Sequence, residues 1–414
     1  ASGKSTFRSA MMSTFAPGSF SKSFAIFTPR TGSVSSRPFV SCPTPPLSSA
    51  ELDDPSIREQ LPQLLEEIAQ ERGSQSYLGP SIPGHTLLGE IGQGGMSTVY
   101  LARQDKLGRH VAIKIAPSWL GSSERAQQML LQEAHTMARL RHPNIVVIHD
   151  IINVNETIAI SMDWVDGRTL ASLLRTLPDR THADDMELLR VTLGTKAEDS
   201  SHFADTPHRH FALLVRDIAR ATQVVHDNHL LHLDIKPSNV LVRRDGTPLL
   251  ADFGVTRDIR LETSYTRTFA GTPVYAAPEQ LRRNDKKIGP HTDVYSLGVT
   301  LYEALARTQP LKDMDMGSIA DFIESGSMPK LSRYGTISRD LENIVHKAIS
   351  PEPENRYRTA SELADDLSAY LEDRPVRARP LRLSQRIRRR IHHEPWKAGL
   401  ALALSVALPL AAGL

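Results

Sequence analysis

The chain has 414 residues, of which 40% are hydrophobic and 23% charged, and its formal net charge is +2. This is the composition of an ordinary soluble protein, long enough for a two-lobed globular domain with further segments at both ends. The single cysteine, Cys42, excludes an internal disulfide framework and fits a reducing compartment.

The first fifty residues are rich in Ser, Thr and Pro, and no acidic residue precedes Glu51. They show no sustained apolar period and cannot bury enough surface to offset the entropy of ordering, so we expect residues 1–50 to be disordered. An organelle transit peptide is the alternative for this composition. In residues 51–84, apolar side chains recur at helical spacing as far as Arg72 and predict an amphipathic helix packed on the main domain, followed by a linker.

A glycine-rich turn between two predicted strands begins the main domain, in the stretch "LLGEIGQGGMSTVYLAR" at residues 87–103. Gly92, Gly94 and Gly95 allow backbone amides to approach phosphate oxygens that a Cβ would obstruct. An ordinary hairpin remains the alternative, because Ser97 stands where such phosphate loops usually have a third glycine.

The next predicted strand, "HVAIKIA" at residues 110–116, carries one cation among apolar residues. Burial of a lone ammonium is costly, so Lys114 needs an anion. The helix predicted by "ERAQQMLLQEAHTMARL" offers Glu133 as one partner, and a nucleotide phosphate would be another.

A polar stretch at residues 178–209 precedes a long predicted helix. It contains His182, His202 and His208 beside several acidic residues. A solvated loop is the expectation, and a metal site is the alternative.

The stretch "LLHLDIKPSNVLV" at residues 230–242 places Asp234, Lys236 and Asn239 on one predicted loop. The following "VLVRRDGTPLLADFG" predicts two strands around an Asp-Gly hairpin turn, with Asp252 just after the second strand. Two carboxylates and an amide that converge on one loop face suit a divalent metal ion with oxygen ligands.

The C-terminal segments differ sharply in charge. Residues 372–397 are dense in arginine, whereas residues 398–414 carry no charge and are rich in Ala and Leu. These features predict a basic juxtamembrane run and the start of a transmembrane helix, with the basic flank in the cytoplasm. A buried C-terminal helix is the alternative. We expect the basic run to bind lipid headgroups and expect no nucleic-acid partner.

Taken in order, these motifs resemble the eukaryotic-type serine/threonine protein kinases over about residues 85–371. The resemblance rests on the glycine loop, the "VAIK" lysine, the "DIKPSN" loop, Asp-Phe-Gly at 252–254 and Ala-Pro-Glu at 277–279. It implies an α+β fold of two lobes, with a small β-rich N-lobe and a larger helical C-lobe. The "GGMS" loop and the C-terminal apolar segment are similar to those of bacterial membrane-anchored serine/threonine kinases. Residues 178–209 look like an insertion in this pattern.

The resemblance also implies residue roles. Asp234 would orient the substrate hydroxyl and accept its proton, Lys236 would steady the γ-phosphate, and Asn239 and Asp252 would hold Mg²⁺ or Mn²⁺. Lys114 would hold the α and β phosphates of ATP and pair with Glu133. The implied nucleotide-binding set is Ile91, Gly92, Gln93, Gly94, Gly95, Met96, Ser97, Thr98, Val99, Ala112, Lys114, Glu133, Met162, Asp163, Val165 and Leu241. Within it, Met162 matches the gatekeeper and residues 163–165 match the hinge.

Two further matched positions, Asp293 and Arg356, would stabilise the C-lobe. One position departs from the pattern: Leu233 stands where many relatives have an arginine that pairs with a phosphate on the activation loop. The loop here, residues 252–279, offers four hydroxyl side chains as candidate phosphosites: Thr263, Ser264, Thr266 and Thr268. Although Leu233 cannot pair with a phosphate, Arg257 could hold one. We therefore expect an active enzyme that depends only weakly on loop phosphorylation.

The resemblance implies an ATP-dependent protein kinase that acts on Ser and Thr of protein substrates. It further implies a single-pass membrane protein with its kinase domain on the cytoplasmic side, engaged in signalling. Autophosphorylation through dimerisation is also expected. A pseudokinase that acts as a scaffold or binding module is the alternative, although Lys114, Asp234, Asn239 and Asp252 are all retained.

Overall fold

A computed structural model describes the greater part of residues 81–378. The described residues are 62–63, 81–94, 97–115, 134, 138–154, 157–178, 185–195, 202–252, 257–258, 273–282, 287–309, 322–323, 325–326 and 328–378. The predicted disordered tail, most of the predicted amphipathic helix, residues 379–397 of the predicted basic run and the apolar segment 398–414 lie outside these residues. Among the described residues, no helix has the length and apolar character required to cross a membrane.

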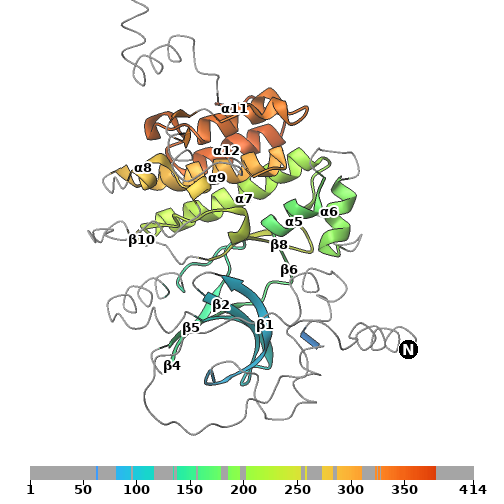
Figure 1. The fold of residues 1–414 in the computed structure, drawn as a ribbon, viewed down its shortest axis with the longest axis vertical. Helices are drawn as coiled ribbons and strands as arrows, with labels where there is room; N and C mark the ends of the chain where they lie inside the picture. Colours follow the sequence, from blue (N-terminus) through green and yellow to red (C-terminus); the bar gives the residue numbers. More distant parts are fainter. Residues whose placement is uncertain are drawn as a thin grey trace, which may run out of the picture. The chain divides into compact units, whose positions relative to one another are not determined.

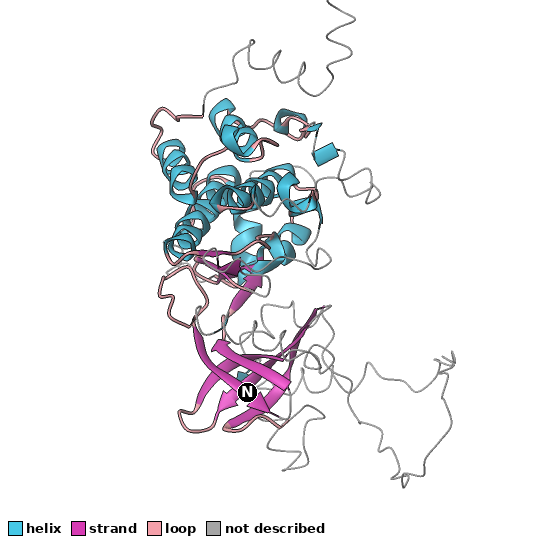
Figure 2. Cartoon of the chain, turned by 90° about the vertical axis from the view of Figure 1, so that its left-hand side faces the viewer, coloured by secondary structure: helices cyan, strands magenta, loops and turns pink. Residues whose placement is uncertain are grey.

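The described elements form two lobes, one rich in strands and one helical (Figure 2). The N-terminal lobe is a five-stranded antiparallel sheet in the order β1-β2-β3-β5-β4 (Figure 1). Its strands are β1 (His85–Gly94), β2 (Ser97–Gln104), β3 (Arg109–Ile115), β4 (Ile148–Val154) and β5 (Thr157–Asp163). The hairpin predicted around the glycine-rich turn is therefore confirmed as β1 and β2.

One face of this sheet forms the small core of the N-terminal lobe. Side chains alternate between the two faces of a strand, so Val111, Ile113 and Ile115 of β3 share a face. All three are buried, and they pack with Ala102 of β2 and Ala159 of β5. The opposite face of β3 therefore carries Ala112 and Lys114. The ammonium of Lys114 is thus kept out of the apolar core.

The C-terminal lobe is helical, with α5 (Leu170–Thr176), α6 (Asp185–Leu193), α7 (Pro207–Asp227), α8 (Pro278–Leu281), α9 (Pro290–Ala306), α11 (Arg339–Ala348) and α12 (Ala360–Leu371). Proline at the first position of α7, α8 and α9 favours the helical start, where no amide partner is lost. Thr169, Ser338 and Thr359 cap the starts of α5, α11 and α12 with side-chain hydrogen bonds to backbone amides. Short 3₁₀ turns occur at Pro237–Asn239 (η2), Pro273–Tyr275 (η3), Leu331–Arg333 (η5) and Pro353–Asn355 (η6).

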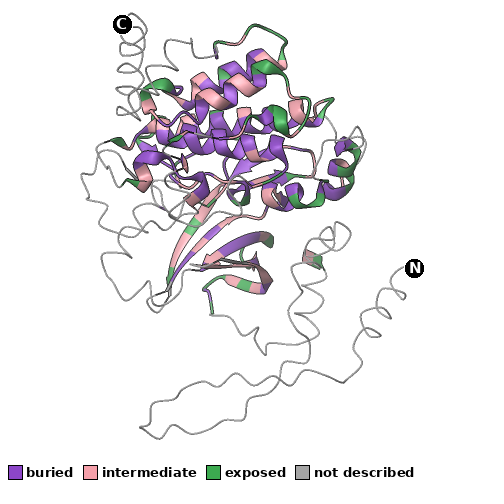
Figure 3. Cartoon of the chain, turned by 45° about the horizontal axis from the view of Figure 1, so that its top comes forward, coloured by how far each residue is buried: buried purple, intermediate pink, exposed green. Residues whose placement is uncertain are grey.

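The core of this lobe is built around α7 and α9. Almost every residue of α9 from Thr292 to Ala306 is buried, which is the pattern of a helix surrounded by others (Figure 3). Gly298 lies where α9 meets α11: a Cβ there would lie 2.7 Å from the Cβ of Ala348. Glycine at this position thus permits the close approach of α9 and α11.

Two small sheets adjoin the loop that carries Asp234, Lys236 and Asn239. β6 (Gly167–Thr169), β8 (Val240–Arg243) and β9 (Pro248–Leu250) pair in the order β6-β8-β9, and β7 (Leu230–Leu231) pairs with β10 (Arg257–Asp258). β8 and β9 form the predicted hairpin, with Gly246 in its turn at a φ of +84°. The loop between β7 and η2 is the stretch that carries Asp234.

The polar stretch at residues 178–209 contains a helix, so the expectation of a solvated loop was wrong there. Helix α6 buries Met186, Leu189 and Leu193 in the core of the C-terminal lobe. Its first residue, Asp185, forms an ion pair of 3.2 Å with Arg307, and both side chains are buried. Burial lowers the pKa of Arg307 to about 10, and the carboxylate of Asp185 opposes that shift. This ion pair attaches α6 to the end of α9.

Candidate active site

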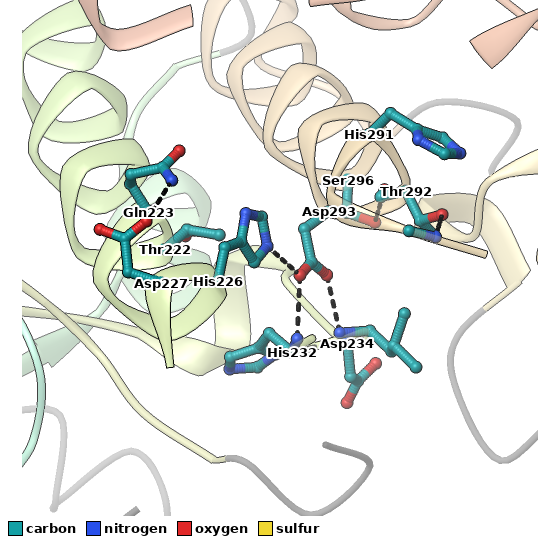
Figure 4. A network of polar contacts seen from close by, with 12 residues as sticks. Thr222, Gln223, His226, Asp227, His232, Asp234, His291, Thr292, Asp293 and Ser296 are labelled. Carbon is teal, nitrogen blue, oxygen red and sulfur yellow. Dashed lines mark hydrogen bonds and ion pairs between the residues drawn. The ribbon is translucent and has the colours of Figure 1, made fainter. Parts of the chain in front are cut away.

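The buried carboxylate of Asp293 fixes the loop between β7 and η2. Asp293, in the first turn of α9, accepts hydrogen bonds from the backbone amides of His232 (2.9 Å) and Leu233 (2.7 Å). It also accepts a third, of 2.8 Å, from Nε2 of His226 at the end of α7 (Figure 4). The position of the loop is thus set by two helices of the C-terminal lobe.

Asp293 is fully buried and still ionised. Burial alone raises the pKa of its carboxyl group, but the hydrogen bond and charge of His226, together with the His232 contacts, outweigh burial and lower it. Hydrogen bonds to the charged form favour that form. The structural role expected of Asp293 is therefore accounted for by three specific contacts. The contribution of His226 was not foreseen, because no local motif marks that residue.

The neutral ring of His232 forms hydrogen bonds to the backbone of Asp234 and to the backbone of Ala251, which directly precedes Asp252. Its Nδ1 accepts the backbone N–H of Asp234 at 3.3 Å, so this nitrogen carries no hydrogen. Its Nε2 lies 3.3 Å from the carbonyl oxygen of Ala251 and donates to it. Burial lowers the pKa of His232, although the nearby carboxylates of Asp293 and Asp234 oppose this, and the neutral form is favoured.

The Asp234 carboxylate is oriented by its two neighbours on the loop. Lys236 Nζ donates to Oδ2 at 2.8 Å, and Asn239 Nδ2 donates to the same oxygen at 3.1 Å. Asn239 Nδ2 also donates to the backbone carbonyl of Asp234 at 2.8 Å. Within the part of the chain that the structure describes, Oδ1 makes no hydrogen bond. One oxygen of Asp234 is thereby held and the other remains able to accept a proton.

Asp252 and Lys114 meet although 138 residues separate them in sequence. Lys114 Nζ forms an ion pair with Oδ1 of Asp252. Asp252 follows β9, where Leu250 bonds to the backbone of Asn144 and Ala251 donates to the carbonyl of Asn239 at 2.9 Å. Asp252 was predicted as a metal ligand, not as a partner of Lys114. The predicted partner, Glu133, lies outside the described residues.

The sheet face that carries Lys114 also carries three of the predicted nucleotide contacts. In the register of the sheet, Val99 lies opposite Lys114 and Ala112 lies opposite Met162. Residues directly opposite one another in antiparallel strands project to the same side. Val99, Ala112, Lys114 and Met162 therefore share one face, and Gly92 pairs with Val99 at its margin.

An apolar cluster continues this face beyond β5. Val165 packs with Val146 and Leu249, and Met162 and Leu241 pack against the same cluster. Asp163, between them in sequence, is held by Nε2 of His149 at 2.7 Å. The predicted gatekeeper, hinge and adenine-contacting residue Leu241 are thus brought together from two strands, β5 and β8, and the loop that follows β5.

Several predicted site residues are described only in part or not at all. Ile91, Gly92, Ser97 and Thr98 lie in β1 and β2, and only the backbones of Gln93 and Gly94 are described. Gly95, Met96, Glu133 and the four candidate phosphosites Thr263, Ser264, Thr266 and Thr268 lie outside the described residues. Arg257 lies in β10, opposite Leu231.

The donor atoms on this surface fit a hard divalent cation. Asn239 uses its amide nitrogen on Asp234, its amide oxygen accepts a long hydrogen bond of 3.4 Å from Ser238 Oγ and keeps a second lone pair, and the Asp252 carboxylate is 43% exposed. Amide and carboxylate oxygens are the ligands that Mg²⁺ prefers. Over the described residues, no group of three or more His, Cys, Asp and Glu side chains lies together as a metal site. His202, from the polar stretch, is instead paired with Asp217 at 2.9 Å.

Comparison with protein families finds one match over this region. The model of the protein kinase domain family matches residues 85–367. Among curated proteins, the serine/threonine-protein kinase PknB of Mycobacterium leprae is 32% identical over 307 residues, which cover 72% of this chain and 45% of that protein. PknB of Mycobacterium tuberculosis is 33% identical over 290 residues, covering 68% and 42% respectively. The chain spans less than half the length of these relatives.

Among solved structures, the kinase domain of PknI from Mycobacterium tuberculosis is similar in fold. The two chains superpose with a TM-score of 0.53 at 23% sequence identity, over 72% of this chain and 99% of that one. At this identity the likeness concerns the fold alone.

Proposed function

The chain belongs to the protein kinase family, and from this premise we propose that it transfers the γ-phosphate of ATP to serine or threonine hydroxyls of proteins. The observation that carries the proposal is the Asp234 carboxylate, which is held on Oδ2 by Lys236 and Asn239 and has no hydrogen-bond partner for Oδ1 among the described residues. A general base must be oriented and must keep one oxygen within reach of the proton that it accepts.

The side chains around Asp234 have complementary tasks. Oδ1 of Asp234 would orient the substrate hydroxyl and take its proton. The ammonium of Lys236, 2.8 Å from Oδ2, keeps the carboxylate in one orientation and brings positive charge to the place where phosphate oxygens would arrive. Preorganised charge of this kind is the main source of rate in phosphoryl transfer.

Nucleotide binding follows from the sheet face described above. The apolar face of Val99, Ala112, Met162 and Leu241 would cover the adenine, and Lys114 would bind the α and β phosphates. Asn239 and Asp252 would hold Mg²⁺, which when bound neutralises phosphate charge. The ion pair between Lys114 and Asp252 supports this assignment, because the cation that would bind phosphate lies beside the anion that would bind Mg²⁺.

The proposal is tested with the full chain, Mg²⁺ and labelled ATP, on three peptides whose only hydroxyl belongs to Ser, Thr or Tyr. We expect label on the Ser and Thr peptides only. Asp234→Asn should lower the rate by at least about a hundredfold, because a neutral amide cannot accept the proton. Asp227→Asn, which changes an exposed carboxylate at the end of α7, is the matched control and should leave the rate unchanged.

Two results would contradict the proposal. A chain that binds Mg·ATP in calorimetry but labels none of the peptides would be the scaffold that we set aside. Near wild-type turnover of Asp234→Asn would show that another group is the base.

We also propose that residues 372–397 and 398–414 attach the enzyme to a membrane, with the kinase domain on the cytoplasmic side, and that it autophosphorylates. Support comes from the charge pattern of the sequence. The full chain should stay with membranes in high salt and be released by detergent, whereas a chain that ends near Asp373 should be soluble. Release by salt alone would indicate attachment through charge only.

An Asp234→Asn chain mixed with wild type should become labelled if autophosphorylation occurs between molecules.

A further inference from the structure

Both backbone polar groups of Leu233, its N–H and its carbonyl oxygen, are held by side chains from elsewhere in the C-terminal lobe. The amide of Leu233 donates to Asp293 Oδ1 at 2.7 Å. The carbonyl oxygen of Leu233 accepts a hydrogen bond of 3.0 Å from Nε2 of Gln280. Gln280 lies in α8, 47 residues further along the chain, and no prediction from the sequence includes it.

The backbone at Leu233 needs such support. Its φ is +62°, in the left-handed region that costs energy for a side chain with a Cβ, and the residue is buried. A backbone in this region persists where its surroundings determine it. Asp293 and Gln280 together satisfy both polar groups of this residue.

The direction of the Leu233 carbonyl also fixes the residue that follows. That carbonyl and the amide of Asp234 belong to one planar peptide group. The amide side of this plane is held weakly, by a 3.3 Å hydrogen bond to His232 Nδ1. The carbonyl side is held by Gln280. Rotation of this plane about the Cα–C bond of Leu233 would move the Cα of Asp234 and the carboxylate that it carries.

Gln280 is itself a rigid support. Its Oε1 accepts the backbone amide of Ala277 at 2.9 Å, so both ends of the side-chain amide are used. The residue before it, Glu279, is buried and receives two hydrogen bonds from Arg356, of 2.7 and 2.9 Å. Helix α8 is thereby fixed to the core of the C-terminal lobe.

We propose that Gln280 is a positioning residue for Asp234, acting through the carbonyl of Leu233. The proposal rests on the proposed phosphotransfer activity and identifies a support for its base that requires no phosphate. The side-chain amide of Gln280 orders the backbone of residue 233 directly. A charged side chain at position 233 would order this backbone only after a phosphate had been added to the activation loop.

The test uses two variants and a matched control in the full chain. Gln280→Leu removes both hydrogen bonds of the side chain, whereas Gln280→Glu keeps an acceptor for Ala277 and removes the donor to Leu233. Gln223→Leu is the control: Gln223 also uses both ends of its amide, accepting from Ser361 N at 3.1 Å and donating to Asp227 at 2.8 Å, and lies away from Asp234. For each chain, kcat, the KM for ATP and the Tm are measured.

We expect kcat to fall roughly tenfold in both Gln280 variants, while the KM for ATP stays within about twofold, because the nucleotide contacts are made by other residues. The control should keep its kcat even where its Tm falls. Wild-type kcat in Gln280→Glu would overturn the proposal, as would a kcat that falls only in proportion to the folded fraction. If Gln280→Leu does not fold, Gln280→Glu decides alone. An inactive wild-type chain would instead overturn the proposed function, which separates the two failures.

Discussion

Asp293→Asn tests the frame on which the catalytic loop rests. The change keeps the shape of the side chain and removes its charge. Of the three hydrogen bonds that the carboxylate accepts, two reach Oδ2 and one reaches Oδ1. An asparagine can place its oxygen on the Oδ2 side, but its NH₂ group then faces the amide of Leu233, donor against donor.

The magnitude follows from these contacts. A hydrogen bond to a charged acceptor contributes about 1.5–3 kcal/mol, and a buried donor left without a partner costs about 1–3 kcal/mol. We expect the free energy of unfolding to fall by about 3–5 kcal/mol, which corresponds to roughly 5–8 °C in Tm for a domain of this size. The kcat should fall further than the folded fraction, because Leu233 directly precedes Asp234.

The effect has a defined pH dependence. The folded-state pKa of Asp293 lies below its ordinary value of 3.8, so its contribution to stability is complete above that value and is lost as the pH falls through the folded-state pKa. The part of the stability difference between wild type and Asp293→Asn that comes from the ionised carboxylate should therefore persist down to about pH 4 and shrink below it.

Urea unfolding of both chains at each pH measures this difference, with Asp227→Asn as the control. Asp227 lies at the end of α7 and accepts only a surface hydrogen bond from Gln223 (Figure 4). A loss of under about 1 kcal/mol in Asp293→Asn at pH 8 would refute the reasoning, and so would a stability difference that does not shrink below about pH 4.

Three further predictions concern other contacts. Lys114→Met should weaken ATP binding in calorimetry and lower kcat/KM by at least about a hundredfold, and an unchanged affinity would remove Lys114 from the nucleotide site. Arg356→Met should lower the free energy of unfolding by about 3–5 kcal/mol, because it leaves buried Glu279 uncompensated. The double variant with Glu279→Leu should recover part of this loss in urea unfolding, and a strictly additive result would show that the pair is not coupled. Replacement of Thr266 and Thr268 together by Ala should lower turnover by less than about tenfold, and a hundredfold loss with an intact Tm would show that loop phosphorylation is required.

Local patterns in the sequence predicted the parts of the site that a single strand or loop determines. Lys114 lies between Ile113 and Ile115, and strand alternation alone places its side chain on the face opposite the apolar core. The spacing of Asp234, Lys236 and Asn239 places all three on one tight loop, where the structure joins them by hydrogen bonds. Such features depend on backbone geometry over a few residues.

Contacts between distant segments could not be predicted in this way. The pairing of Lys114 with Asp252 and the support of Leu233 by Gln280 depend on how the lobes and helices pack. Helix α6 is a different case, because a periodic signal was present: Met186, Leu189 and Leu193 recur at intervals of three and four residues. Histidines and acids in the surrounding stretch outweighed that signal in the prediction of a loop.

The departure from the kinase pattern at residue 233 is explained by its surroundings. The side chain of Leu233 is only 6% exposed, and an uncompensated charge buried to this extent would need an anion nearby. An arginine there would be satisfied only when a phosphate or another anion arrives, which is how loop order becomes tied to activity. Leucine needs no such partner, and the backbone of the same residue is already held by Asp293 and Gln280. A site with these contacts would orient Asp234 before any phosphate is added, so we expect control of the enzyme to act elsewhere than through residue 233.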